Sequence, residues 1–100
     1  MNFDSFSDFY KFYLLEHSKV GTKIFHFIGT ALVIVFLFSF FYTKDFLYFF
    51  LAPMMGYGFA WFSHFFIEKN TPATFKNPIY SLISDFVMFY EILTGRIKIY

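Results

Sequence analysis

The chain has 100 residues and a net charge of +1, so it has room for one domain and no electrostatic basis for binding nucleic acid. Aromatic residues make up 29% of the sequence, more than a domain of this size can bury, and charged residues only 15%, against about 25% in soluble domains. We therefore expect much of the surface to face lipid, and the absence of cysteine excludes disulfides, zinc–thiolate sites and thiol catalysis.

The first segment, residues 5–17, has the pattern of an amphipathic helix. Ser5 is followed three residues later by Asp8, which resembles the capping box that begins many helices. Polar residues then recur at helical spacing, and aromatic residues cover the opposite side. We expect this helix to lie at the membrane surface or against other helices, and to end at Gly21.

Two long uncharged segments follow, residues 24–42 and residues 46–67. Each has about the 20 apolar residues that a membrane-spanning helix needs, and the polar turn at residues 43–45 joins them into a hairpin. Pro53 and the two glycines that follow it predict a kink or break in the second helix. The same glycines predict a place where another helix approaches closely.

The remaining chain predicts a loop and a fourth helix. Residues 68–78 form the longest polar stretch and contain two of the three prolines, which indicates a loop. Residues 79–93 then predict a helix that is too short to span a membrane without help, followed by Gly95 as a C-cap. Its polar residues form a stripe at helical spacing: Ser81, Ser84, Asp85 and Glu91.

The sequence therefore predicts a single all-α membrane domain over residues 1–100. It contains two transmembrane helices in a hairpin, an N-terminal amphipathic helix, and a short fourth helix with a polar stripe. The sequence does not indicate an oligomeric state.

The three histidines are expected to meet at one face of the membrane. His26 lies 18 residues before Lys44 and His64 lies 20 residues after it. On antiparallel helices these separations are roughly 27 and 30 Å at about 1.5 Å per residue, so the two rings reach nearly the same depth. His17 is only nine residues from His26. Ionisable groups inside a membrane are costly and tend to face the interior of a bundle, which makes each a functional candidate.

Histidine is a common ligand of iron, zinc and copper. Two or three histidines with one carboxylate are typical of non-haem Fe(II) oxygenases, which leave coordination positions free for oxygen and substrate. Glu16, Glu68 and Asp85 are the carboxylates near the same face, and Asp85 is the strongest candidate because it lies within a helix. The alternatives are histidines that only form structural hydrogen bonds, a solvated or capping Asp85, and interfacial charges at the two glutamates. The spacing alone does not identify the metal.

Several linked motifs cover most of the chain. They are two histidines nine residues apart, His-x-x-x-Glu-Lys-Asn from His64, Pro-Ala-Thr-Phe from Pro72, and Ser-Leu-x-x-Asp-x-x-Met from Ser81. With these motifs, residues 9–30 and 58–88 resemble the yeast 2-hydroxy fatty acid dioxygenase-like family of small membrane proteins. The resemblance implies an Fe(II)-dependent dioxygenase that shortens 2-hydroxy fatty acids by one carbon in α-oxidation, with O2 as the second substrate.

The resemblance also implies roles for particular residues. By position, His17, His26 and His64 match the motif histidines that hold iron, and Asp85 is a further candidate as a catalytic residue or metal ligand. The other polar motif positions, which carry no assigned role, are Glu68, Asn70 and Thr74.

The leading hypothesis from the sequence is a membrane-bound Fe(II)-dependent dioxygenase acting on 2-hydroxy fatty acids. One alternative is a membrane protein that holds haem between His26 and His64 on antiparallel helices. The other is a non-catalytic membrane adaptor whose histidines satisfy polar neighbours.

The distribution of lysines predicts an orientation. Lys44 alone lies at the turn, so the positive-inside rule places the histidine face on the cytoplasmic side. The membrane is expected to be the inner membrane in a bacterium or the endoplasmic reticulum in a eukaryote. The lysines on the histidine face are Lys19, Lys23, Lys69 and Lys76.

Overall fold

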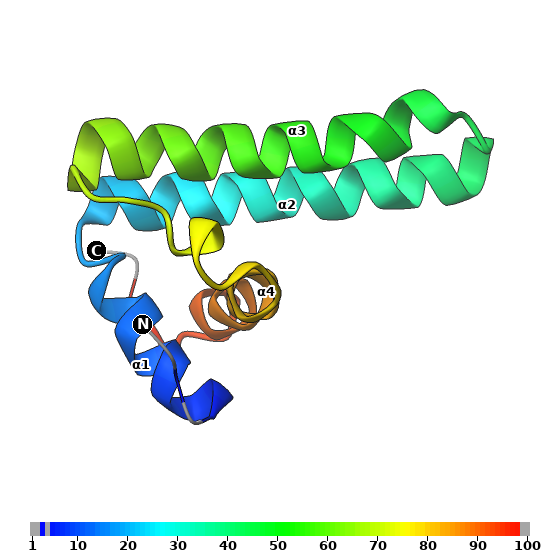
Figure 1. The fold of residues 1–100 in the computed structure, drawn as a ribbon. Coiled ribbons are helices and arrows are strands. Elements are labelled where there is room, and N and C mark those ends of the chain that lie inside the picture. Colours follow the sequence, from blue (N-terminus) through cyan, green and yellow to red (C-terminus); the bar gives the residue numbers. More distant parts are fainter. Residues whose placement is uncertain (1–2, 4, 99–100) are drawn as a thin grey trace.

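A computed structural model describes residue 3 and residues 5–98, and this part of the chain is helical, without strands (Figure 1). The all-α fold class is therefore confirmed. α2 and α3 form a long antiparallel hairpin, while α1 and α4 pack beside the end remote from its turn, with α4 crossing the hairpin. The helices are α1 (Phe6–Leu15), α2 (Val20–Thr43), α3 (Phe46–Ser63) and α4 (Pro78–Leu93), with a π-helical turn (His64–Glu68) and a 3-10 turn (Ala73–Phe75).

α1 begins as the capping pattern predicts, because the Ser5 hydroxyl accepts a hydrogen bond from the backbone N–H of Asp8 at 3.2 Å. The predicted end of this helix at Gly21 is wrong. α1 ends at Leu15, and Gly21 lies in the first turn of α2. The reason for a glycine here is packing, since a Cβ at Gly21 would lie 3.2 Å from Cδ1 of Ile67 in the π-helical turn.

The hairpin is held by a close approach of α2 and α3 at Gly29 and Gly56. A Cβ at Gly29 would lie 3.0 Å from Cβ of Phe59, and a Cβ at Gly56 would lie 2.6 Å from Cγ2 of Val33. The close contact expected near Pro53 is therefore present. The expected break is not, because α3 continues through Pro53 as one helix.

Gly56→Ala is expected to destabilise the protein by about 1–3 kcal/mol, because the added methyl group overlaps Val33, whose branched side chain has little rotational freedom. Gly58→Ala is the matched control, since a Cβ there would meet nothing within 4 Å. Thermal unfolding in detergent, followed by circular dichroism, measures both. Equal stability of the two variants would contradict the close helix contact.

Apart from an apolar cluster of Phe9, Tyr13 and Met88 between α1 and α4, the described part of the molecule buries polar side chains and exposes apolar ones. Among the described residues, the buried polar side chains outnumber the buried apolar ones, and many large apolar side chains are exposed. α4 follows this rule: Ser81 and Ser84 of its polar stripe are buried, whereas Ile79 is 71% exposed. Helices Val20–Thr43 and Phe46–Glu68 are both long and apolar enough to cross a membrane. In water this distribution of side chains would be unfavourable, whereas surrounding lipid favours it.

Candidate metal centre

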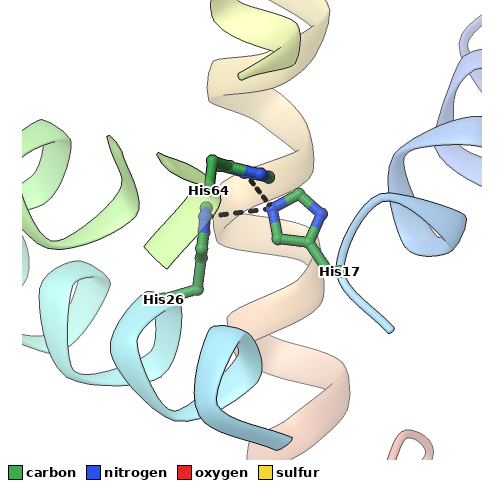
Figure 2. Close-up of side chains that lie close together, drawn as sticks. All are labelled: His17, His26 and His64. Atoms are coloured by element: carbon green, nitrogen blue, oxygen red, sulfur yellow. Dashed lines mark hydrogen bonds between the residues drawn. The ribbon is translucent and has the colours of Figure 1, made fainter. Parts of the chain in front are cut away.

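Three histidines from separate segments converge at the end of the hairpin remote from its turn (Figure 2). His17 lies in the link between α1 and α2, His26 lies in α2, and His64 begins the π-helical turn. All three are buried, with 1–5% of each residue exposed. The Nε2 atom of His17 lies 3.0 Å from Nε2 of His26 and 3.0 Å from Nε2 of His64. One ligand nitrogen from each ring lies within 4.8 Å of the others.

The π-helical turn sets the orientation of His64. Lys69 ends this turn in the left-handed conformation (φ 61°), and the chain then folds back so that the Asn70 backbone N–H donates to the His64 carbonyl at 2.9 Å. Asn70 Oδ1 then accepts from Nδ1 of His64 at 2.7 Å. The Asn70 amide keeps Oδ1 toward His64 because its Nδ2 donates to the Glu16 carboxylate at 2.8 Å. π-helical turns are rare and frequently lie at functional sites.

His17 is oriented by α1. Its Nδ1 donates to the backbone carbonyl of Tyr13, one turn earlier, at 2.7 Å. Its ring also stacks on the Tyr13 ring, with the ring centroids 4.1 Å apart. Tyr13 is itself buried, so this side of the site is closed to solvent.

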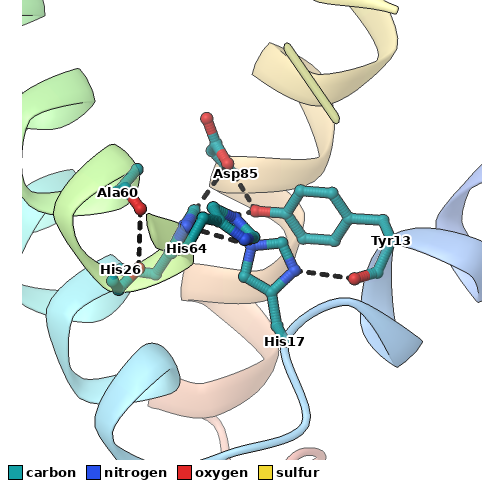
Figure 3. Close-up of polar contacts among 7 residues, drawn as sticks. Tyr13, His17, His26, Ala60, His64 and Asp85 are labelled. Atoms are coloured by element: carbon teal, nitrogen blue, oxygen red, sulfur yellow. Dashed lines mark hydrogen bonds and ion pairs between the residues drawn. The ribbon is translucent and has the colours of Figure 1, made fainter. Parts of the chain in front are cut away.

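His26 is bordered by a tyrosine–aspartate pair (Figure 3). The Tyr13 hydroxyl donates to the Asp85 carboxylate, and burial followed by the nearby charge of Asp85 raises the pKa of Tyr13, which keeps this donor protonated. Nδ1 of His26 lies 3.5 Å from Asp85 Oδ1 and 3.4 Å from the Tyr13 hydroxyl. Asp85 therefore faces Nδ1 of His26, while Nε2 of the same ring faces His17. The structure does not bring Asp85 into the group of converging nitrogens.

The protonation of the rings indicates what this cluster can bind. Nδ1 of His17 and of His64 each face an oxygen that only accepts hydrogen bonds, so each Nδ1 carries the proton. Burial, and then the neighbouring His26 and His64, hold the pKa of His17 well below its usual range, so this ring is neutral at neutral pH. Each Nε2 then presents a lone pair, and the lone pairs of His17 and His64 face each other at 3.0 Å without a proton between them.

A cation shared by the nitrogens would remove this repulsion. Two nitrogens bound to one ion at about 2.1 Å, with their bonds at a right angle, lie about 3.0 Å apart, which matches the separations seen here. Outer hydrogen bonds that fix the tautomer of a ligating histidine are a general feature of protein metal sites. The donor set therefore fits a metal ion held by imidazole nitrogens.

The other polar residues singled out in the sequence lie around this cluster. Glu68 accepts the backbone N–H of Lys19 at 2.7 Å and the Ser18 hydroxyl at 3.3 Å, so it ties the π-helical turn to the start of α2. Thr74 is half-buried in the 3-10 turn, and Asn70 is a direct partner of His64. Glu16, which precedes His17, accepts hydrogen bonds from the Asn70 amide at both its carboxylate and its backbone carbonyl.

Tyr13 is the residue of the site that the sequence did not single out. Its position gives one usable signal: it lies one helical turn before His17, on the apolar side of an amphipathic helix. A buried tyrosine there needs a partner for its hydroxyl, whereas a phenylalanine would not.

The arrangement does not favour haem. In a bis-histidine haem site the two rings face each other across the plane of the macrocycle. Here His17 lies against both other rings, with ring centroids 4.2 Å from His26 and 4.5 Å from His64. A macrocycle between His26 and His64 would overlap the His17 ring.

Comparison with known proteins gives one family. The family described as 2-hydroxy-palmitic acid dioxygenase Mpo1-like matches residues 3–97, which includes every residue of the histidine cluster and its hydrogen-bond partners. No curated protein and no solved structure is similar enough to the chain to count as a match.

Proposed function

Because the chain belongs to the 2-hydroxy-palmitic acid dioxygenase Mpo1-like family, we propose that it is a membrane-bound, iron-dependent dioxygenase that shortens 2-hydroxy fatty acids by one carbon. The observation that carries this proposal is the group of three buried imidazoles, whose ligand nitrogens lie within 4.8 Å of one another. Two helices long and apolar enough to cross a membrane support contact with a lipid substrate.

The proposed reaction needs no external reductant. The C1–C2 bond of the 2-hydroxy acid breaks, C1 leaves as carbon dioxide, and C2 becomes the carboxyl carbon of the shortened acid. One 2-hydroxy acid and one O2 then give one shortened acid, one carbon dioxide and one water. The substrate supplies all the electrons that reduce O2. Bound iron would hold the substrate carboxylate and 2-hydroxyl and activate O2.

The residues of the chain have two tasks in this proposal. The Tyr13 carbonyl and the Asn70 side chain hold His17 and His64 in the tautomer that leaves Nε2 free. Asp85, which accepts a hydrogen bond from the Tyr13 hydroxyl, lies 3.5 Å from Nδ1 of His26 and borders that side of the ring. Burial of all three rings excludes bulk water from the nitrogens.

Metal analysis tests the proposal. Protein purified in detergent without chelator is expected to contain one iron per chain, and to release one carbon dioxide for each O2 consumed with a 2-hydroxy fatty acid. Stoichiometric zinc or copper without iron would contradict the proposed cofactor. A folded protein with negligible metal would support the adaptor alternative instead.

We also propose that the histidine end of the hairpin faces the cytoplasm, because Lys19, Lys23 and Lys69 lie at that end and Lys44 lies at the turn. A cysteine introduced at Lys44 is then expected to react with a membrane-impermeant maleimide from outside the cell, or from the lumen. One introduced at Lys69 is the control and should react from the cytoplasm. The reverse pattern of labelling would overturn the orientation.

A further inference from the structure

A cavity of about 320 Å³ begins beside His26 and Asp85 and runs along the hairpin. On α2 its lining residues are His26, Thr30, Val33 and Leu37, which recur on one face of the helix. His26 and Leu37 are eleven residues apart, so the cavity follows α2 for about 16 Å at ~1.5 Å per residue. The cavity is therefore long and narrow, and one of its ends is lined by His26 and Asp85, whereas His17 and His64 do not line it.

The two ends of the cavity differ in polarity. His26 and Asp85 line one end, with Thr30 one turn further along α2. Leu37, Phe49 and Ala52 line the other end, and the wall between them is mainly apolar. This pattern fits a single-chain amphiphile, whose polar head would lie at the histidines and whose hydrocarbon tail would point toward the turn at Lys44.

The position of α4 leaves the far part of the cavity accessible from the side. Leu82 and Phe86 of α4 line the cavity near its polar end, but the hairpin projects well past α4 toward its turn (Figure 1). The hydrocarbon core of a bilayer is about 30 Å thick, so a length of about 16 Å corresponds to one leaflet. A lipid chain in the cavity would run parallel to α2, as chains of the surrounding lipids do.

We propose that this cavity binds the hydrocarbon chain of the substrate, with its carboxylate at the histidines and its methyl end at Leu37 and Phe49. The substrate then enters sideways from the leaflet on the histidine side, and the far end of the cavity limits the chain length that the enzyme accepts. This inference rests on the proposed function for the identity of the head group, and on the lining of the cavity for the direction of the chain.

Photolabelling tests the direction of the chain without turnover. Two fatty acids of sixteen carbons that lack the 2-hydroxyl are used, one with a diazirine at its methyl end and one with a diazirine near its carboxylate. The first is expected to label the region of Leu37 and Phe49, and the second the region of Thr30 and Phe86. An excess of unlabelled fatty acid should remove both signals. Identical labelling by the two probes, or labelling that only a two-chain phospholipid displaces, would overturn the proposal.

Substitutions at the far end test the limit on chain length. Ala52 is 1% exposed and lines this end, so Ala52→Leu is expected to lower kcat/KM for a sixteen-carbon substrate about tenfold and leave a ten-carbon substrate nearly unchanged. Phe49→Ala enlarges the same end and should shift the preference toward longer chains. Met54→Leu is the matched control, because Met54 is 66% exposed on the same helix and does not line this cavity.

The two levels of the proposal fail separately. If the two probes label the two expected regions but no 2-hydroxy acid is turned over, the binding site stands and the proposed reaction is wrong. If the enzyme turns over 2-hydroxy acids but both probes label the same region, the reaction stands and the binding site is wrong. The same holds if neither Ala52→Leu nor Phe49→Ala changes the preference for chain length.

Discussion

Replacing His64 by alanine is expected to lower the affinity for Fe(II) at least about a hundredfold, because loss of an outer partner alone typically costs 10–100-fold and here a ligand itself is lost. Turnover of 2-hydroxy fatty acids should fall below detection in the same variant. The same result is expected for His17→Ala and His26→Ala, since in the proposed site all three nitrogens would bind one ion. Anaerobic titration with Fe(II), followed by metal analysis, measures the affinity.

His64→Gln separates a ligand from a structural hydrogen-bonding residue. Glutamine retains a polar side chain that can reach Asn70, but it lacks the imidazole lone pair that points at His17. If His64 binds metal, His64→Gln should lose iron as completely as His64→Ala while keeping its helical circular dichroism. Iron binding and turnover that survive in the glutamine variant, or in a variant without any of the three histidines, would refute the metal centre.

Tyr13→Phe is expected to weaken Fe(II) binding about 10–100-fold, the range measured for outer partners of metal ligands. The substitution leaves the ring that stacks on His17, but it removes the hydroxyl that fixes Asp85 beside His26. Affinity is measured by competition with a chelator of known strength. The three-histidine set remains complete in this variant, so iron should still bind at saturating concentration.

Tyr10→Phe is the matched control for this experiment. The Tyr10 hydroxyl donates to Glu91, so it joins α1 to α4 by the same kind of bond, but the structure gives it no contact with a histidine. Both variants should lose similar stability, about 1–3 kcal/mol if the carboxylate is left without its donor. Only Tyr13→Phe should change the affinity for iron. An equal fall in iron affinity in both variants would mean that this affinity depends on the α1–α4 contact and not on the position of Asp85.

The helices could be predicted from the sequence because each depends on local chemistry. The length of the two uncharged segments indicated α2 and α3, and the short polar turn between them fixed an antiparallel hairpin. Counting residues from Lys44 was then enough to bring His26 and His64 to one depth. Ser5 and Gly95 likewise marked helix ends through preferences that belong to single residues, and Gly95 does lie just beyond α4 with φ 83°.

The details of the site depend on contacts that local patterns do not encode. Composition gives no signal for the π-helical turn or for the left-handed Lys69, yet together they bring Asn70 back to His64. The prediction for Gly21 is wrong because a glycine that ends a helix and one that makes room for a neighbouring side chain look alike in sequence. The roles of the three histidines and of Asp85 in binding and catalysis stay predictions.

The distribution of the histidines along the chain has a consequence for biogenesis. They come from three segments, separated by nine residues and then by thirty-eight. Until His64 has been synthesised, the growing chain holds only two of them, one in the link between α1 and α2 and one in α2. The three nitrogens come together only after α2 and α3 have paired and α1 has docked, so an incomplete chain cannot present all three to a metal ion.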